Sequence, residues 1–254
     1  KYLAKQLELY AYRNAEQVIA LSPGMSEGVA KTGYPIENIH IIPNSSDISF
    51  FQLNKKLKIG LQNKYKWNVG DKIIIYTGTL GEINGVEYLV DIANEFIEIN
   101  NKVKFLIVGD GIEEQAIRNK AKIYNCLDNN LFLINQLPKN KMPGLYNLST
   151  IATSLFIPLK EMEANSANKF FDTLAAGKPI VINYGGWQKD LIEKHNIGLV
   201  LARDPKVAAK ALNELLKNDE LLSIMGKNAL SLGKSEFSRD KLADKLINVL
   251  ESYA

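Results

Sequence analysis

The sequence predicts an α/β fold, with a parallel six-stranded sheet covered by helices on both faces. Between residues 72 and 201, six short runs rich in Val, Ile and Leu alternate with segments whose apolar residues have helical spacing. Strands that are apolar along their whole length are typical of parallel sheets buried on both faces. After residue 205 only helical patterns follow. We therefore expect one sheet domain and a helical C-terminal tail.

The first fifty residues precede this regular alternation. The helical spacing of Tyr2, Leu3, Leu7 and Tyr10 predicts a helix that ends near Asn14. A short strand, a helix with a serine N-cap and a first-turn proline, and a second strand are predicted next, at Gln17–Leu21, Ser22–Val29 and Ile39–Ile42.

A polar, lysine-rich segment from Gln52 to Asp71 follows, and we place a linker or domain boundary there. From Lys72 onward the strands and helices alternate regularly. The strands of the sheet are predicted at Ile73–Tyr76, Val103–Val108, Leu131–Ile134, Ile151–Ile157, Ile180–Ile182 and Leu199–Leu201.

Helical patterns fill the intervals between these strands and complete a Rossmann-like domain. Gly177 and Pro179 stop the helix that begins at Asn168, since neither residue continues a helix well. The helices are predicted at Val86–Ile99, Ile112–Tyr124, Met142–Leu148, Asn168–Ala176 and Gln188–His195, and in the tail at Val207–Leu216, Leu221–Leu232 and Leu242–Leu250.

The composition argues against several kinds of partner. The net charge is only +3 and the basic residues are dispersed, so nucleic acid is not an expected partner. Cys126 is the only cysteine, and His40 and His195 lie far apart, so neither a disulfide nor a metal site is expected. No apolar run approaches the roughly 20 residues that span a bilayer. We expect a cytoplasmic protein, and the mildly basic charge leaves a peripheral contact with anionic lipid open.

A glycine-rich loop follows the first strand of the sheet, with Gly78, Gly81 and Gly85 between that strand and its helix. Glycines at this place let a phosphate approach backbone N–H groups and the positive end of the helix. The spacing differs from G-x-G-x-x-G, so the dinucleotide-binding fingerprint is not met. A tight turn that simply needs glycine is the alternative, and the pattern alone leaves both interpretations open.

Two later turns close the second and third strands. Asp110, inside a Gly-Asp-Gly turn, is expected as the N-cap of a helix that starts at Ile112. Gln136 and Leu137 follow the third strand, where they could offer backbone groups to the edge of a base.

The polar loop from Lys160 to Asn168 directly follows a buried strand, which is where functional loops are placed. Lys169 begins the next helix and Asp172 lies three residues further, so the two side chains face the same way. A lysine at a helix N-terminus makes an anion site. A carboxylate one turn further can accept two hydrogen bonds from a vicinal diol such as a ribose. The alternative is a surface helix with an ordinary i,i+3 ion pair, but the position of the loop favours a substrate site.

Several motifs, in order along the chain, carry a resemblance to a known family. Residues 77–89 read TGTLGEINGVEYL, residues 105–111 read FLIVGDG, and residues 165–179 read NSANKFFDTLAAGKP. Together they resemble the C-terminal half of a GT-B glycosyltransferase. They are most similar to the retaining family 4 enzymes that transfer sugars from nucleotide donors in bacterial surface-polysaccharide assembly. Residues 15–22 and 41–47 resemble the end of the N-terminal half, so the resemblance covers nearly the whole chain.

The resemblance implies a role for each matching residue. Residues 78–81 and Lys169 would contact the donor diphosphate, and Gln136 and Leu137 would meet the nucleotide base. Asp172 takes the place of the second Glu of the family's Glu-x7-Glu motif, which binds the ribose hydroxyls. The implied donor-binding residues are Gly78, Thr79, Leu80, Gly81, Asn84, Gln136, Leu137, Asn165, Ser166, Asn168, Lys169 and Asp172.

The chain departs from the family pattern in two places. The first Glu of the motif would fall at Ala164, and the neighbouring Glu163 is the nearest candidate for a catalytic residue. The family's basic pair after the first strand would fall near Thr79 and Asn84. Two positive charges are therefore missing from the diphosphate site, and we expect Lys169 to carry more of that task.

The resemblance implies a metal-independent transferase without a cofactor, acting on a UDP-linked hexose or N-acetylaminosugar and a glycan or lipid-linked acceptor. Its setting would be capsule or O-antigen polysaccharide biosynthesis in the cytoplasm, at the inner face of the membrane. The implied domains are the end of the acceptor domain (1–52), the Rossmann-like donor-binding domain (53–238) and a C-terminal helix that crosses back to the N-terminal part (239–254). Because most of the acceptor domain would be missing, we expect weak nucleotide binding and little turnover.

Three other functions stay open. A nucleotide-sugar 2-epimerase of GT-B fold shares the sheet and the nucleotide site, although the motif at the start of the helix fits the transferases better. A nicotinamide oxidoreductase would want G-x-G-x-x-G after the first strand, which is matched only in part. A non-catalytic nucleotide-binding α/β module is the third, and the missing basic pair favours it slightly. The sequence does not decide the sugar, the base, the acceptor or the oligomeric state.

Overall fold

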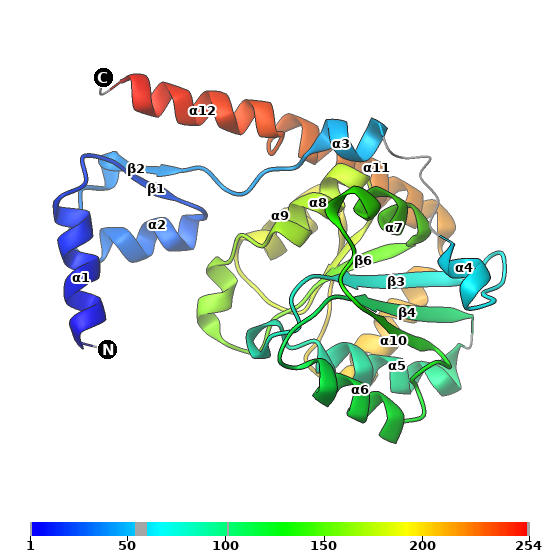
Figure 1. Ribbon diagram of the computed structural model, residues 1–254. Coiled ribbons are helices and arrows are strands. Elements are labelled where there is room, and N and C mark those ends of the chain that lie inside the picture. The colour runs from blue at the N-terminus through cyan, green and yellow to red at the C-terminus, as the bar shows by residue number, and fades with distance from the viewer. Residues whose placement is uncertain (1, 54–59, 101, 253–254) are drawn as a thin grey trace.

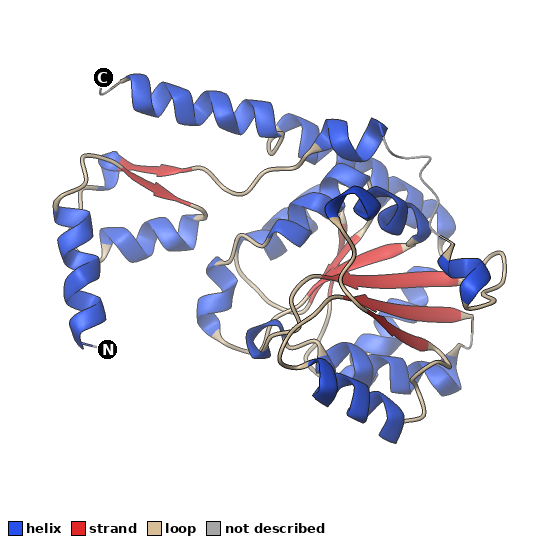
Figure 2. Ribbon diagram, in the orientation of Figure 1, coloured by secondary structure: helices blue, strands red, loops and turns tan. Residues whose placement is uncertain are grey.

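The computed structural model describes residues 2–53, 60–100 and 102–252, and it confirms the predicted α/β fold. Six parallel strands form one sheet in the order β5-β4-β3-β6-β7-β8, and helices cover both of its faces (Figures 1 and 2). The strands are β3 (Lys72–Thr77), β4 (Val103–Val108), β5 (Leu131–Ile134), β6 (Ile151–Ser154), β7 (Ile180–Ile182) and β8 (Gly198–Val200).

Strands β3 and β4 pair along their full length, from Lys72 opposite Val103 to Thr77 opposite Val108. On its other side β3 pairs with β6, so the order of the strands reverses at β3. Because all six strands are parallel, their carboxyl ends meet at one edge of the sheet. In open α/β sheets, ligands bind at that edge next to the point of reversal.

The two faces of β3 point into two different cores. The helices around the sheet are α3 (Ile48–Leu53), α5 (Glu87–Ile99), α6 (Glu114–Ile123), α7 (Met142–Leu148), α8 (Asn168–Ala176), α9 (Trp187–His195), α10 (Pro205–Leu216) and α11 (Asp219–Ser235), and α12 (Arg239–Glu251) follows them. Ile73 and Ile75 pack towards α3, α7 and α8, whereas Ile74 and Tyr76 pack towards α5, α6 and α10. Successive side chains of a strand alternate between its faces, which explains why this strand is apolar throughout.

A small lobe precedes the sheet domain (blue in Figure 1). Its elements are α1 (Tyr2–Arg13), β1 (Val18–Ala20), α2 (Pro23–Ala30), a 3₁₀ turn (Ile36–Asn38) and β2 (Ile39–Ile41), with β1 and β2 parallel. Ala20, Val29 and Ile39 form its small core. Ser22 caps α2 as predicted, since its hydroxyl accepts a hydrogen bond of 3.1 Å from the N–H of Met25.

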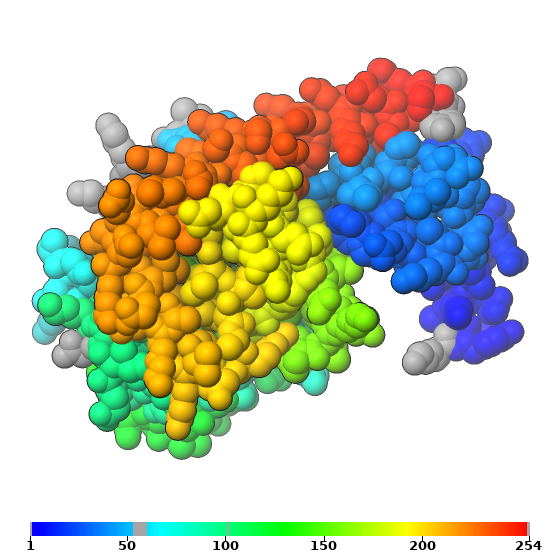
Figure 3. Space-filling view, turned by 180° about the vertical axis from the view of Figure 1, so that it is seen from behind, coloured from blue at the N-terminus to red at the C-terminus, as the bar shows by residue number. Residues whose placement is uncertain are grey.

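Helix α12 leaves the sheet domain and runs back along the small lobe, as Figures 1 and 3 show. Leu242 and Val249 pack against Ile42, just beyond β2. The ammonium of Lys245 also donates a hydrogen bond of 2.7 Å to the carbonyl of Ile41. Both ends of the described chain therefore contribute to one region of the molecule. Within the described residues, no helix is long and apolar enough to cross a membrane.

One strand is shorter than predicted. The apolar run at Ile151–Ile157 predicted a strand of that length, but β6 ends at Ser154. The N–H of Phe156 donates to Oδ1 of Asn183 (2.9 Å), and the next N–H donates to the carbonyl of Ile83 (3.1 Å). Leu155 and Phe156 stay buried because they belong to the hydrophobic cores of the sheet domain, so the run has the composition of a strand although its hydrogen bonds differ.

The turn after β4 also differs from the prediction. Asp110 does not cap the following helix, which begins at Glu114 rather than at Ile112. Instead, the carbonyl of Asp110 accepts a hydrogen bond of 2.9 Å from the N–H of Leu80, and the Leu80 carbonyl accepts one of 2.9 Å from the N–H of Glu113. The turn after β4 therefore holds the glycine-rich loop after β3.

Part of the predicted linker from Gln52 to Asp71 has regular structure, because residues 61–64 form the short helix α4 (Leu61–Lys64). Residues 54–59 of that linker lie outside the described residues.

Candidate functional site

A cleft of about 650 Å³ opens at the carboxyl edge of the sheet, beside β3. We call it the donor cleft, after the role that the family resemblance implies for the residues that line it. It is built from the glycine-rich loop after β3, the turn after β5, the start of α8 and a segment that leads out of the small lobe. Eight of the residues predicted from the sequence line it: Gly78, Thr79, Asn84, Gln136, Leu137, Asn168, Lys169 and Asp172.

The side chain of Lys169 is largely buried against this cleft and has only neutral neighbours. Its ammonium donates to the hydroxyl of Tyr76 (3.2 Å) and to Oδ1 of Asn84 (3.2 Å), and it lies 4.7 Å from the centre of the Tyr76 ring. In the described part of the chain no carboxylate pairs with it. Burial lowers the pKa of Lys169 to about 8, because desolvation disfavours the charged form.

Gly78 gives Lys169 the room that it occupies. A Cβ atom at Gly78 would lie 3.4 Å from Cε of Lys169, and the backbone there has a φ of +133°, which favours glycine. The N–H of Gly78 donates to the carbonyl of Val108 (3.0 Å), and the Thr79 carbonyl accepts from the Tyr76 hydroxyl (2.8 Å). The N–H of Thr79 has no partner among the described residues, so it is free to donate to a ligand.

The first turn of α8 offers further donors to the cleft. Ala167 occupies the N-cap position and has no side-chain oxygen to accept from the first N–H groups of the helix. The helix end is therefore positively polarised at the point where Ala167, Asn168 and Lys169 line the cleft. Together with the ammonium of Lys169, this arrangement is suited to an anion.

Asp172 lies one turn further along α8, on the same face as Lys169, as its spacing predicts. Burial raises the pKa of Asp172 to about 6, against the opposing effect of the Lys139 ammonium and with a smaller contribution from Asp47. The carboxyl makes no ion pair within the described ranges. It is therefore available to accept hydrogen bonds from a ligand.

Ten residues of the cleft wall are missing from the set of site residues predicted from the sequence. Arg239, at the start of α12, forms an ion pair with Asp47, and Asp47 also accepts from the N–H of Phe50 (3.1 Å) at the start of α3. The turn at residues 43–47 was noted in the sequence for its resemblance to the end of the N-terminal half, without a role in the site. The residues that were missed include Asn44, Ser45, Asp47, Lys139 and Arg239.

Four of the predicted residues do not line the cleft. Leu80 is fully buried in the core beside α5, and Gly81 precedes a 3₁₀ turn. The side chain of Asn165 bonds within its own loop, donating to the carbonyl of Met162 (2.6 Å) and accepting from a backbone N–H (3.1 Å). The hydroxyl of Ser166 accepts from the N–H of Asn44 (3.1 Å), so both polar side chains hold the loop in shape.

Glu163 also lies outside the cleft. It belongs to a 3₁₀ segment (Lys160–Ala164), its side chain is exposed, and it lies against the next loop. A Cβ atom at Gly185 would lie 3.2 Å from Oε1 of Glu163, and one at Gly186 only 2.2 Å from the Glu163 carbonyl. The two glycines therefore let the segment approach closely, and the Glu163 carboxylate is not among the groups that line the donor cleft.

Asn84 stands near one position where the family resemblance calls for a basic residue. Here it supplies an acceptor, Oδ1, which holds the ammonium of Lys169 at 3.2 Å. The ammonium of Lys169, from another part of the chain, is thus held near the position where the family has a basic residue. Among the described residues, no group of three or more His, Cys, Asp or Glu side chains is arranged to hold a metal ion.

Comparison with known sequences identifies relatives. Residues 59–231, more than half of the chain, match the family described as glycosyl transferases group 1. The chain is 25% identical over 190 residues to spore coat protein SA of Bacillus subtilis, covering 72% of this chain and 49% of that protein. It is 22% identical over 260 residues to the α-D-kanosaminyltransferase of Streptomyces kanamyceticus, covering 97% of this chain and 63% of that protein. The chain thus spans less than two thirds of the length of these relatives.

Solved structures share the fold. The crystal structure of Anabaena HepE with UDP-glucose superposes with a TM-score of 0.78 at 17% identity, covering 95% of this chain and 65% of that one. S. aureus TarM, solved with UDP and saccharides, gives a TM-score of 0.74 at 19% identity, covering 96% of this chain and 46% of that one. The match of residues 59–231 shows that this chain belongs to the group 1 family of glycosyl transferases, with the fold of GT-B glycosyltransferases.

Proposed function

We propose that the donor cleft binds a nucleotide-diphosphate sugar, with UDP as the nucleotide, and that the whole protein transfers the sugar with retention of configuration. The cleft volume of about 650 Å³ is suited to such a ligand. Support for the nucleotide comes from HepE, which was crystallised with UDP-glucose, and from TarM, which was crystallised with UDP.

One observation carries this proposal. Lys169 is a largely buried cation with no carboxylate partner among the residues that the structure describes, and it lies beside a glycine loop and an uncapped helix start. A buried ammonium held only by neutral groups is costly, and a bound anion removes that cost. The diphosphate of the donor is an anion of suitable size, and Asp172 is placed one helical turn away to accept from the ribose hydroxyls.

The proposed chemistry uses charge stabilisation by the protein alone, without a metal or cofactor. As the bond between sugar and phosphate breaks, negative charge grows on the departing diphosphate. The ammonium of Lys169, the N–H of Thr79 and the first N–H groups of α8 would stabilise that charge. The acceptor would be a glycan or a lipid-linked glycan in surface-polysaccharide biosynthesis, met in the cytoplasm at the inner face of the membrane.

Calorimetric titration with UDP tests the proposal. We expect Lys169→Met to weaken UDP binding about 30- to 100-fold, which corresponds to the loss of one or two charge-assisted hydrogen bonds. Lys178→Met changes the same residue type at the other end of α8 and outside the cleft, and UDP binding should stay unchanged. Equal UDP affinity in the original chain and in Lys169→Met would contradict the proposed site.

The position of Glu163 favours a second candidate, a nucleotide-binding module that does not transfer sugar. Its carboxylate lies against Gly185 and away from the donor cleft. Incubation of the protein with UDP-glucose and with UDP-N-acetylglucosamine, with and without a glycan acceptor, separates the two. UDP binding without transfer, hydrolysis or epimerisation in the full-length protein supports the module, and transfer supports the enzyme.

A further inference from the structure

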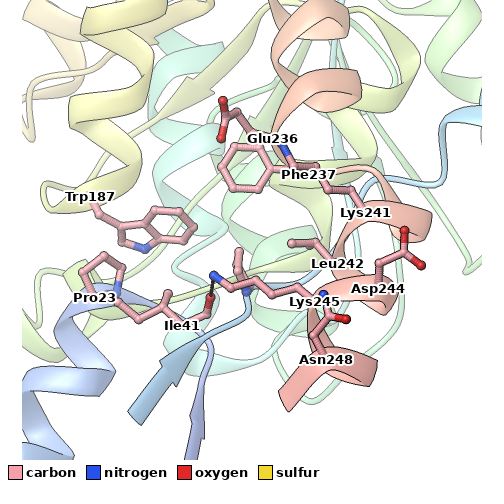
Figure 4. A pocket seen from close by; sticks show the side chains of 11 residues that line it. Pro23, Ile41, Trp187, Glu236, Phe237, Lys241, Leu242, Asp244, Lys245 and Asn248 are labelled. Atoms are coloured by element: carbon pink, nitrogen blue, oxygen red, sulfur yellow. Dashed lines mark hydrogen bonds between the residues drawn. The ribbon is translucent and has the colours of Figure 1, made fainter. Parts of the chain in front are cut away.

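A second cavity lies where the small lobe, the start of α9 and helix α12 meet. We call it the inter-lobe groove. Its volume is about 470 Å³, and it shares no lining residue with the donor cleft. Figure 4 shows Trp187 and Pro23 on one side of the groove and Leu242 with the stem of Lys245 on the other. The residues on its walls thus come from segments far apart in the sequence.

The walls of the groove are apolar and include two aromatic rings. The ring centres of Trp187 and Phe237 are 6.2 Å apart, and Trp187 also lies 6.2 Å from Phe171 in the core. These contacts hold the indole in place. Pro23, Ile41, Pro43 and Leu242 complete the apolar surface. The groove therefore has an aromatic wall, formed mainly by the half-buried Trp187, with aliphatic edges.

The rim of the groove is polar and its charges balance. It carries the ammoniums of Lys241 and Lys245, the carboxylates of Glu236 and Asp244 and the amide of Asn248. Neither carboxylate forms an ion pair in the described chain. Two positive and two negative groups give no preference for an anionic or a cationic ligand. An alkyl chain is also a poor ligand for this groove, because it would leave the polar groups of the rim without hydrogen-bond partners.

We infer that the inter-lobe groove binds a short segment of a neutral oligosaccharide. A sugar ring has apolar C–H faces that stack on an aromatic surface, and hydroxyl groups around its edge that pair with carboxylates, amides and ammoniums. A cavity of about 470 Å³ accommodates about two such rings. The groove is separate from the donor cleft, so this inference goes beyond the proposed reaction.

Hydrogen bonds connect the groove and its neighbour Asn44 with the loop before Lys169. The indole N–H of Trp187 donates to the carbonyl of Asn165 (2.7 Å). Asn44, next to Pro43 of the groove wall, donates its N–H to the hydroxyl of Ser166 (3.1 Å). Both bonds end on the loop that leads into Lys169. A saccharide that packs on Trp187 therefore acts on the loop that carries Lys169, and we expect UDP and saccharide to strengthen each other's binding by the same factor.

Calorimetry and tryptophan fluorescence with maltotetraose, cellotetraose and chitotetraose test this inference, because Trp187 is one of only two tryptophans. We expect at least one tetrasaccharide to bind and to change the fluorescence. Asn248→Phe places a ring into the groove and should lower that affinity at least tenfold. Ala243→Phe puts the same ring on the exposed side of α12, outside the lining, and should leave it unchanged. Trp187→Phe keeps an aromatic wall but loses the N–H, so the effect of saccharide on UDP affinity should disappear.

Several results would overturn the inference. One is that none of the three tetrasaccharides binds, and another is that Asn248→Phe leaves their binding intact. Competition between the saccharide and UDP would also contradict a separate site. So would tighter binding of an acidic tetrasaccharide, or of dodecyl maltoside through its alkyl chain, than of the neutral tetrasaccharides. A UDP titration of the same samples separates this inference from the proposed function. UDP binding without saccharide binding refutes only the groove, and saccharide binding without UDP binding refutes only the donor site.

Discussion

The ammonium of Lys169 lies 3.2 Å from the hydroxyl of Tyr76, and burial of that tyrosine keeps the hydroxyl neutral by raising its pKa. The contact therefore supplies a dipole and no opposite charge. A lysine in this position retains its full charge for a ligand, because no partner in the described chain neutralises it. The same isolation makes the protonation of Lys169 sensitive to mildly alkaline pH.

The affinity for UDP should fall as the pH rises above 8. Free Lys169 has a pKa lowered to about 8, and a bound diphosphate stabilises the ammonium and raises that pKa. Above pH 8 binding must therefore take up a proton, whereas below pH 8 the ammonium is already formed. We expect about a tenfold loss of affinity between pH 8 and pH 9.5, and an uptake of about 0.9 proton at pH 9, measured by calorimetry in buffers of different ionisation heat.

Lys169→Arg is the matched control for this pH dependence, since guanidinium does not deprotonate in this range. Its UDP affinity should be constant between pH 7.5 and 9.5, whatever its absolute value. An unaltered pH dependence in this variant would assign the proton to another group and would contradict the prediction.

Asp172→Asn should make the protein more stable at pH 7 while weakening UDP binding. The pKa of Asp172 is raised to about 6 in the folded protein, so the folded state holds this proton more tightly than the unfolded state does. The free energy of unfolding therefore falls as the pH rises from about 4 through 6 and Asp172 ionises. The amide in the variant does not ionise, so the Asp172→Asn protein does not lose this stability. We expect a gain on the order of 1–3 kcal/mol at pH 7 by denaturant unfolding, and little gain at pH 4.

Glu98→Gln, on the exposed side of α5, is the control for this variant and should change stability at neither pH. UDP affinity should fall at least tenfold in Asp172→Asn only. The quantity to compare is the gain in stability of Asp172→Asn over the original chain at the two pH values. An equal gain at pH 7 and at pH 4 would show that burial does not raise the pKa of Asp172.

The sheet could be predicted because its strands are apolar on both faces. The run at Ile73–Tyr76 reads as a buried strand whichever core each side chain enters, and the structure confirms it. The end of β6 could not be predicted in the same way. Leu155 and Phe156 are buried like strand residues, but the hydrogen bonds of the chain beyond Ser154 go to loop groups, and composition does not record where a backbone N–H donates.

The residues of the donor cleft could be predicted from the sequence where they belong to a single helix. Lys169 and Asp172 share a helix face by their spacing, and both line the cleft. Asp47 and Arg239 pair across 192 residues, so no local pattern brings them together. The role of Asn84 as an acceptor for Lys169 was equally invisible, because it depends on the distance between the glycine loop and the start of α8.

Gly109→Ala should distort the glycine-rich loop. A Cβ atom at Gly109 would lie 2.0 Å from the carbonyl oxygen of Gly78, a contact that only movement of the backbone can relieve. We expect a loss of stability on the order of 2–4 kcal/mol and at least tenfold weaker UDP binding. Gly28→Ala in α2, where a Cβ meets no atom within 4 Å, should leave UDP binding unchanged and should not destabilise the protein. Equal effects of the two substitutions would show that the loop tolerates displacement.

Asn84→Asp should stabilise the protein and weaken its anion site. The two side chains have nearly the same shape, so the acceptor oxygen stays near 3.2 Å from the Lys169 ammonium but now carries a charge. The pair raises the pKa of Lys169 and removes the cost of a buried, unpaired cation. We expect a melting temperature about 2–4 °C higher and at least tenfold weaker UDP binding, because the carboxylate competes with the diphosphate. Asn84→Ala removes the acceptor without adding charge and should change UDP affinity less than threefold. If Asn84→Asp bound UDP as tightly as the original chain, the ammonium of Lys169 would not be the group that meets the diphosphate.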